Sequence, residues 1–214
     1  RKTFDAELLE LNEELTAMAR QAQDAIDVVT ESLSTDDEQT AKAAIDMTAS
    51  LDQMERDIEN RCLRLLLQQQ PVARDLRTIT AAMKMVTDME RIGDHAADIS
   101  ELTVAMAGTP YKLRGDNIKC MAAETIVMLV DAVDSYVTKD MAKARAVIDH
   151  DDVVDDLFLK VKADLIQVIR ENPEYGEYAA DLLMVNKYLE RIGDHATNLA
   201  EWVIFALDNK GEGE

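Results

Sequence analysis

The sequence has few of the residues that interrupt helices and few of those that favour strands. Glycine occurs 7 times and proline 3 times in 214 residues, and aromatic residues make up only 4% of the chain. Leucine, alanine, methionine and acidic residues are plentiful, and most of these favour helices over strands. The composition therefore predicts an all-α fold, with enough chain for one large core or for two cores of about 100 residues each.

Cysteines and long apolar runs are also scarce. Cys62 and Cys120 are the only two cysteines and lie far apart, so neither a zinc ribbon nor a redox motif is indicated. No apolar run reaches the roughly 20 residues that span a bilayer, and residues 1–7 are not followed by the apolar region of a signal peptide. We expect a cytoplasmic protein that does not insert into the membrane.

Basic residues are outnumbered by acidic ones, 23 to 43, which gives a formal net charge of −20. A field of this sign repels phosphate backbones and anionic lipid headgroups, so nucleic-acid binding is disfavoured. It attracts cations, and a metal-binding role is therefore easier to propose than an anion-binding one.

What the sequence has instead is a helical period. Apolar residues recur every three or four positions, as in helices that are buried on one side. Breaks fall just after Ser34, where Thr35 or Asp36 is expected to cap the next helix, at Pro71, and at residues 108–116. The six predicted helices cover about 8–33, 44–65, a stretch that begins just after Pro71, 118–137, 141–169, and a stretch from Asn172-Pro173 to near Leu207.

The heptapeptide Glu-Arg-Ile-Gly-Asp-His-Ala occurs twice, at residues 90–96 and 190–196. The constant offset indicates an internal duplication, and the chain is predicted to form two tandem three-helix bundles, residues 1–108 and 109–214. The segments just before the two copies have diverged. The identity of these seven residues therefore indicates a role that both copies share.

The acidic members of the heptapeptide fall on one face of their helix. At about 100° per residue, an acid and a second acid four positions later lie nearly in line along the helix. This line lies on the side opposite the apolar stripe, so a site near the surface is expected. Two like charges at this spacing cost about 0.2–0.5 kcal/mol and a helical glycine costs about 1 kcal/mol. A bound multivalent cation would offset the repulsion, since carboxylates are its preferred ligands. The two acidic stripes consist of Glu90, Asp94 and Glu101, and of Glu190, Asp194 and Glu201.

Further acids lie on the preceding helix of each half and are candidates to complete the two clusters. They are Asp52, Glu55 and Glu59 in the first half, and Asp151 and Asp155 in the second. The alternative is that all of these acids form a solvated charged surface, which is ordinary in so acidic a protein.

The other members of the heptapeptide are expected to be structural. Arg91 and Arg191 can pair with the aspartates three residues later. His95 and His195 lie about 100° round the helix from the aspartates, so we expect them at a helix interface or at the surface and not on a shared metal. The glycine of each copy is expected to allow close helix approach.

The motifs of common enzyme classes are missing. No histidine follows a glutamate by three positions, which disfavours the di-iron carboxylate enzymes built in four-helix bundles. There is also no glycine-rich phosphate loop, no Gly-x-Ser-x-Gly and no His-Glu-x-x-His.

Three kinds of segment stand out along the chain: Phe4-Asp5-Ala6-Glu7-Leu8, then Gln70-Pro71 followed by Arg74-Asp75-Leu76-Arg77, and Glu-Arg-Ile-Gly-Asp in each half. In order and spacing they resemble the PhoU family, the accessory and regulatory proteins of bacterial phosphate transport. The resemblance covers nearly all of the chain. It implies two tandem three-helix bundles whose Glu-or-Asp-x-x-x-Asp motifs hold multinuclear iron or zinc clusters on the bundle surfaces.

The motif positions that the resemblance assigns to metal binding are Glu90 and Asp94, Glu190 and Asp194, and Asp151 and Asp155. One position departs from the pattern. In the first half Thr48 stands where Asp151 stands in the second, and a threonine hydroxyl is a poor ligand. The first site therefore lacks one acid unless Glu55 or Glu59 replaces it.

The resemblance also implies a function. PhoU-like proteins are taken to restrain the high-affinity phosphate transporter and the phosphate-starvation response when phosphate is plentiful. The chain is then expected to be a non-enzymatic homodimer that contacts the transporter's ATP-hydrolysing subunit and the phosphate-sensing histidine kinase, held at the inner face of the membrane through them. The residues alone leave two alternatives, a hydrolase with carboxylate-bridged metals and a metal-free helical scaffold.

Overall fold

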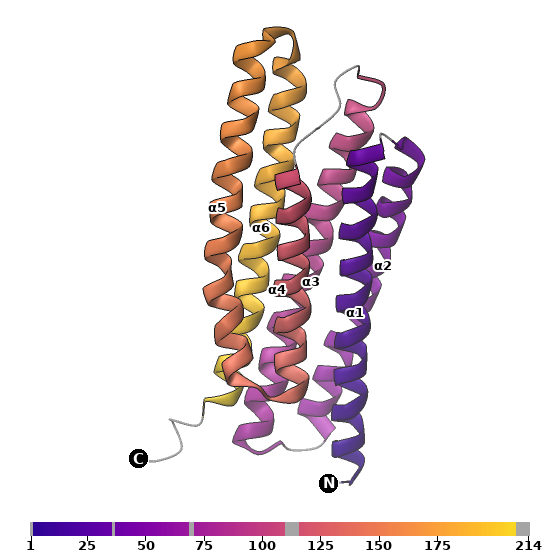
Figure 1. The fold of residues 1–214 in the computed structure, drawn as a ribbon. Helices are drawn as coiled ribbons and strands as arrows, with labels where there is room; N and C mark the ends of the chain where they lie inside the picture. The colour runs from indigo at the N-terminus through magenta and orange to yellow at the C-terminus, as the bar shows by residue number, and fades with distance from the viewer. Residues whose placement is uncertain (1, 36, 69–70, 110–115, 209–214) are drawn as a thin grey trace.

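The computed structural model describes residues 2–35, 37–68, 71–109 and 116–208. Helices account for almost all of these residues, and no strand occurs among them, which confirms the all-α prediction (Figure 1). None of the helices has, over the described ranges, a stretch apolar enough for a bilayer span. The elements are α1 (Lys2–Thr35), α2 (Glu38–Gln68), α3 (Ala73–Met106), α4 (Asp116–Thr138), α5 (Met141–Glu171), a 3-10 turn η1 (Pro173–Tyr175) and α6 (Gly176–Leu207).

The helix ends follow the predicted breaks, with two differences. The first helix begins at Lys2, earlier than its clearest apolar period. The cap of α2 is Asp37, whose Oδ1 accepts hydrogen bonds from two backbone N–H groups of the first turn at 3.0 and 3.3 Å. Thr35 is the last residue of α1 and not the cap, and Asp36 lies outside the described residues.

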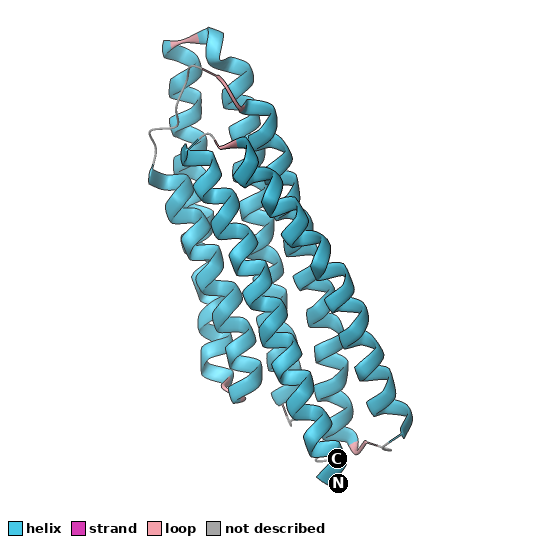
Figure 2. Cartoon of the chain, turned by 90° about the vertical axis from the view of Figure 1, so that its right-hand side faces the viewer, coloured by secondary structure: helices cyan, strands magenta, loops and turns pink. Residues whose placement is uncertain are grey.

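The six helices run alongside one another as two three-helix bundles, α1 to α3 and α4 to α6 (Figures 1 and 2). The bundles meet where α3 packs against α6 and α1 against α4, whereas α2 and α5 touch only elements of their own bundle within the described ranges. The apolar stripes form the core, which confirms the helical period read from the sequence. On α1 the fully buried members are Leu11, Leu15, Met18, Ala22, Ala25, Ile26 and Val29.

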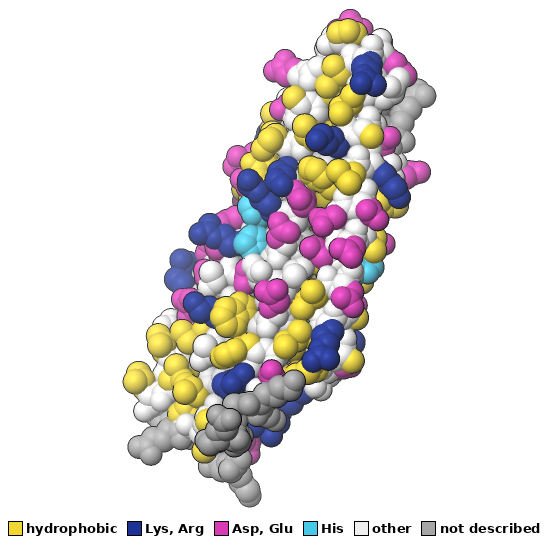
Figure 3. All heavy atoms as spheres, turned by 90° about the vertical axis from the view of Figure 1, so that its left-hand side faces the viewer, with side chains coloured by type: hydrophobic (Ala, Val, Ile, Leu, Met, Phe, Trp, Pro, Cys, Tyr) yellow, Lys and Arg dark blue, Asp and Glu magenta, His cyan; other side chains and the backbone are white. Residues whose placement is uncertain are grey.

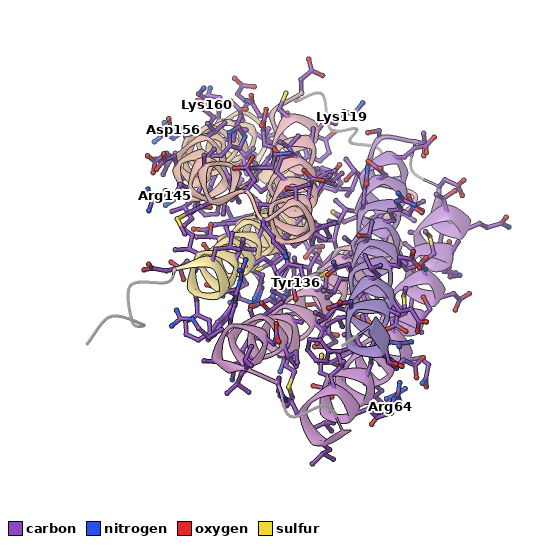
Figure 4. All side chains as sticks on the ribbon, turned by 90° about the horizontal axis from the view of Figure 1, so that it is seen from below. Arg64, Lys119, Tyr136, Arg145, Asp156 and Lys160 are labelled. Carbon is purple, nitrogen blue, oxygen red and sulfur yellow. The ribbon has the colours of Figure 1, made fainter. Side chains whose placement is uncertain are left out.

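Polar contacts tie the two bundles together at the end where the chain begins. Arg77 donates from Nε and Nη2 to the backbone oxygen of Phe205 at 3.1 and 2.6 Å, and its guanidinium lies 4.5 Å from the centre of the Phe205 ring. An unpaired carbonyl in the last turn of α6 is thereby satisfied. Tyr136, which lies between the bundles in Figure 4, donates its hydroxyl to the backbone oxygen of Thr78 at 3.1 Å.

Candidate metal centres

In the first bundle, α2 and α3 bring three acids together. One carboxylate oxygen each from Asp52, Glu90 and Asp94 lies within 4.8 Å of the other two. Glu90 and Asp94 are one turn apart on α3, and Asp52 faces them from α2. Oxygens that surround one ion at bond lengths of about 2.0–2.6 Å have separations of this size.

The first-bundle acids crowd one another. Burial of the side chain is the main cause that raises the pKa of Glu90 to about 7, and the charges of Asp94 and Glu55 add to the effect. The pKa of Glu55 is also raised, first by burial and then by Glu59 and Asp52. A cluster of this kind is unfavourable without a cation beside it.

Arg91 supplies one positive charge to this cluster. Its Nη1 lies 3.2 Å from Asp94 Oδ2 and its Nε 3.8 Å from Glu90 Oε2. The predicted pairing with Asp94 is confirmed, but the arginine side chain is 60% exposed, so the pair contributes little to stability. In the second bundle Arg191 takes another direction and lies 5.8 Å from the centre of the Tyr188 ring.

In the second bundle, α5 and α6 bring together Asp151, Asp155, Glu190 and Asp194. Burial raises the pKa of Asp151 to about 6, and the charges of Asp155 and Asp194 raise it further. The pKa values of Asp155 and Asp194 are raised first by burial and then by Glu190. Lys187 forms an ion pair with Glu190. Figure 3 shows acidic side chains gathered midway along this face of the molecule, with histidines beside them.

One oxygen of the second cluster is unsatisfied. Asp151 Oδ1 is buried and has no hydrogen-bond partner in the described structure. A buried carboxylate oxygen without a partner is costly. A cation bound at this position would satisfy it, so the residues of the second cluster fit a metal ion.

The glycines of the heptapeptide allow close helix approach, as predicted. A Cβ placed on Gly93 would lie 2.4 Å from Leu51 Cδ1, so α2 presses directly on the glycine. A Cβ on Gly193 would lie 3.3 Å from Val154 Cγ1 and 3.4 Å from the unsatisfied Asp151 Oδ1. Glycine is therefore what lets each acid of α2 or α5 reach its partners on α3 or α6.

The histidines of the heptapeptide join the two bundles, which confirms the prediction of a helix interface. The rings of His95 and His195 stack across α3 and α6 with their centres 5.5 Å apart. His195 Nδ1 lies 2.8 Å from Asp88 Oδ1, and His95 Nδ1 lies 3.4 Å from Asp98 Oδ2. These contacts explain why the repeated motif contains a histidine that lies at the interface between the bundles and not in the acid cluster of its own bundle.

One expectation about the acidic stripes is wrong, and the metal role of Glu101 and Glu201 stays a prediction. Glu90 does not point to the far side of its helix, since its side chain is only 18% exposed where α2 packs against α3. Glu101 and Glu201 are exposed and lie seven residues beyond the aspartates, about 10 Å further along the helix axis. They are not among the described acids that the structure brings together.

Some charged residues that act on these clusters or on the bundle interface were not identified from the sequence. Asp152 raises the pKa of both Asp151 and Asp155, and its position beside Asp151 was a usable signal. Lys187 could also have been identified from the sequence, because its partner Glu190 follows it by three residues on the same helix. Asp88 carried no such signal, because its partner His195 lies in the other bundle.

Comparison with known protein families identifies the family of the chain, which the geometry of the clusters does not reveal. The family model described as the PhoU domain matches residues 15–103 and matches again at residues 118–203. The chain belongs to the PhoU family.

Curated PhoU relatives match over most of the chain. A protein of Clostridium acetobutylicum is 37% identical over 211 residues, which are 98% of this chain and 96% of the relative. One from Aquifex aeolicus is 37% identical over 86% of this chain and 84% of its own length. Both are named phosphate-specific transport system accessory protein PhoU homologs.

Solved PhoU structures have the same architecture. The crystal structure of PhoU from Pseudomonas aeruginosa has a TM-score of 0.89 at 30% identity, over 95% of this chain and 98% of that one. That of the phosphate transport system regulatory protein PhoU from Streptococcus pneumoniae has a TM-score of 0.85 at 23% identity, over 95% and 96%.

Proposed function

We propose that this chain is a metal-binding adaptor that restrains phosphate uptake and the phosphate-starvation response when phosphate is plentiful, and that it is not an enzyme. The observation that carries the proposal is the relationship to proteins named as phosphate transport accessory proteins, at 37% identity over 98% of the chain. The absence of any nucleophile-and-base motif from the sequence agrees with a regulatory role.

The proposed metal is iron or zinc, held by Asp52, Glu90 and Asp94 in the first bundle and by the second-bundle acids Asp151, Asp155, Glu190 and Asp194. Two observations support it. Three oxygens of the first bundle converge within 4.8 Å, and Asp151 Oδ1 of the second is buried without a partner. These acids would hold a cation, which would neutralise the charges that α2 and α3, or α5 and α6, bring together.

The proposed partners are the transporter's ATP-hydrolysing subunit and the phosphate-sensing histidine kinase. A surface suited to protein contact lies beside the turn between α2 and α3, where Leu67, Val72 and Leu76 are 82%, 57% and 46% exposed. Close by, Leu9 and Arg74 line a hollow of about 300 Å³. Large exposed apolar side chains at one end of a highly charged molecule favour a role in contact.

Capture of the purified transporter ATPase by the tagged, metal-loaded chain tests the adaptor role. We expect the wild-type chain to retain the ATPase and Leu67→Glu to lose it, because a charge in the contact surface must be desolvated. Leu159→Glu is the matched control, since Leu159 on α5 is also well exposed, at 60%. Failure of the wild-type chain to capture either the ATPase or the kinase contradicts the proposal.

A phosphatase assay with added iron, manganese or zinc separates the adaptor from a metal-dependent hydrolase. We expect no turnover above that of the free metal ions. Robust turnover that disappears in both Glu90→Ala and Asp194→Ala would replace the adaptor with the enzyme.

A further inference from the structure

We infer that the hollow lined by Leu9 and Arg74 receives an acidic side chain, flanked by apolar ones, from a segment of the partner protein. The inference rests on the proposed function, because the partner is the one that the adaptor contacts. It adds which chemistry the partner presents and which two cations of this chain bind it, Arg74 and Lys139.

The hollow lies across the seam between the two bundles. Arg74 in the first turn of α3 lines it from the first bundle, and Lys139 just after α4 and Leu207 at the end of α6 line it from the second. Tyr136, which lies between the bundles in Figure 4, is the buried part of the lining, and its hydroxyl is already bound to the backbone oxygen of Thr78. A side chain held in this hollow would therefore contact both bundles.

Two acids also line the hollow, and their own helices account for them. Asp5 and Asp75 lie in the first turns of α1 and α3, where the partial positive charge of a helix N-terminus favours a carboxylate. Arg74 lies in the same first turn as Asp75, where a positive charge is unfavourable. The helix thus explains the acids of the hollow and does not explain its arginine.

The lysine of the hollow is also in an unfavourable place. Lys139 has a φ of 58°, in the left-handed region where glycine is the usual residue at a helix end. The turn requires this conformation, because the backbone N–H groups of Lys139 and Asp140 donate to the carbonyls of Tyr136 and Ser135 at 3.3 and 2.9 Å. A side chain kept at a strained backbone position is a reason to look for a function.

Both cations are available to a ligand. Neither Arg74 nor Lys139 forms an ion pair or a side-chain hydrogen bond with any residue that the structure describes. Other cations are engaged, since Arg77 binds the carbonyl of Phe205 and Arg61 pairs with three glutamates of α1. A carboxylate that entered the hollow could accept two hydrogen bonds from the guanidinium of Arg74.

The surroundings favour a protein segment over an anionic membrane. Leu9, on the rim of the hollow, is 64% exposed, and the exposed Val72 and Leu76 flank Arg74 in the sequence. Apolar side chains around a concave cationic site fit a protruding acidic residue between apolar neighbours, as at the anchor positions of protein interfaces. A bilayer surface is flat, and anionic headgroups are repelled by a chain of net charge −20.

Charge reversal tests the inference on whichever partner the wild-type chain captures, the purified transporter ATPase or the kinase. Arg74→Glu with Lys139→Glu should weaken the Kd, measured by biolayer interferometry, by about tenfold or more. Arg145→Glu with Lys160→Glu is the matched control, because it makes the same change of charge at exposed residues on the outer side of α5 (Figure 4). An unchanged Kd in the first double variant, or an equal loss in both, overturns the inference.

Filling the hollow without changing its charge gives a second test. Asn12 lines the hollow, so Asn12→Trp should weaken capture, whereas Gln167→Trp at an exposed position of α5 should not. If the charge-reversed variant fails to fold, as far-UV circular dichroism will show, Asn12→Trp decides alone, and unchanged capture by that variant contradicts the inference.

Two further outcomes separate the inference from its alternatives. If the charge-reversed variant loses binding to phosphatidylglycerol vesicles while its Kd for the partner is unchanged, the hollow belongs to a membrane contact and the inference is wrong. A wild-type chain that captures neither the ATPase nor the kinase overturns the proposed function itself. Capture that Leu67→Glu abolishes, but that both hollow variants retain, leaves that function standing and overturns only the inference.

Discussion

Replacing Gly93 by alanine should destabilise the chain more than the same replacement at Gly193. At Gly93 the new Cβ would lie 2.4 Å from Leu51 Cδ1, far inside the contact distance of about 3.5–4.0 Å between carbon atoms. Leu51 is fully buried, so its side chain has to move into a packed core. Such overpacking costs about 1–3 kcal/mol, while alanine in place of a helical glycine returns about 1 kcal/mol.

The corresponding change at Gly193 meets less resistance. Its new Cβ would lie 3.3 Å from Val154 Cγ1, so a movement of a few tenths of an ångström relieves the contact. The gain in helix propensity is then retained almost in full. We expect Gly193→Ala to exceed Gly93→Ala in stability by about 1–3 kcal/mol, or roughly 2–12 °C in Tm for a chain of this size.

Thermal and urea unfolding of both variants in the presence of a chelator measures the difference. A rescue variant isolates the cause. Leu51→Val removes the atom that clashes and copies the valine at the equivalent position of the second bundle, so Gly93→Ala should be far better tolerated in that background. A Gly93→Ala chain that melts at or above Gly193→Ala would refute the reasoning.

Two further predictions concern the charges around the heptapeptide. The pKa of Glu90 is raised to about 7 in the folded, metal-free chain, against about 4.3 when unfolded, so the folded state binds more protons in this window and loses stability as the pH rises through it. Glu90→Gln should therefore stabilise the metal-free chain at pH 8 and leave it unchanged near pH 4, and urea titrations of the variant and the wild type at the two pH values measure this; equal stability changes at both would contradict the reasoning. Asp88→Ala should lower stability by about 1–3 kcal/mol, because Asp88 accepts from His195 at 2.8 Å and from Asn198 at 3.1 Å across the bundles. The matched change Asp98→Ala removes only a 3.4 Å contact with His95, and an equal loss of stability in both variants would contradict this account of the interface.

Much of the fold is predictable from the sequence because the signals are local. Apolar spacing marks the helices, and prolines mark two of the turns, since proline lacks the backbone donor that a helix requires. The repeated heptapeptide likewise singles out Glu90 with Asp94, because residues four apart share a helix face in any fold.

What could not be predicted depends on how the helices pack. The sequence offers Asp52, Glu55 and Glu59 as candidates, but only the side of α2 that meets α3 decides that Asp52 is the one whose oxygen converges with Glu90 and Asp94. The same packing buries Glu90 where its helix alone would leave it exposed. The stacking of His95 on His195 requires the two bundles to be placed against each other, and no spacing within one helix encodes that contact.

The duplication helps to assign roles within the heptapeptide. Its isoleucine and alanine are buried in both copies, its glycine receives the neighbouring helix, and its histidine joins the bundles. Only the glutamate and the aspartate, Glu90 and Asp94 with their second-half counterparts, face a cluster of other acids. These two positions are where a change should remove metal while the fold remains intact.

Anomalous X-ray diffraction at the iron and zinc absorption edges, from crystals of the chain purified without chelators, tests the central claim most directly. We predict a peak within bonding distance of Asp52, Glu90 and Asp94, and further peaks beside Asp151, Asp155, Glu190 and Asp194. Crystals that hold no iron or zinc at either cluster, or that hold it only elsewhere on the surface, would contradict the claim that these carboxylates are metal centres.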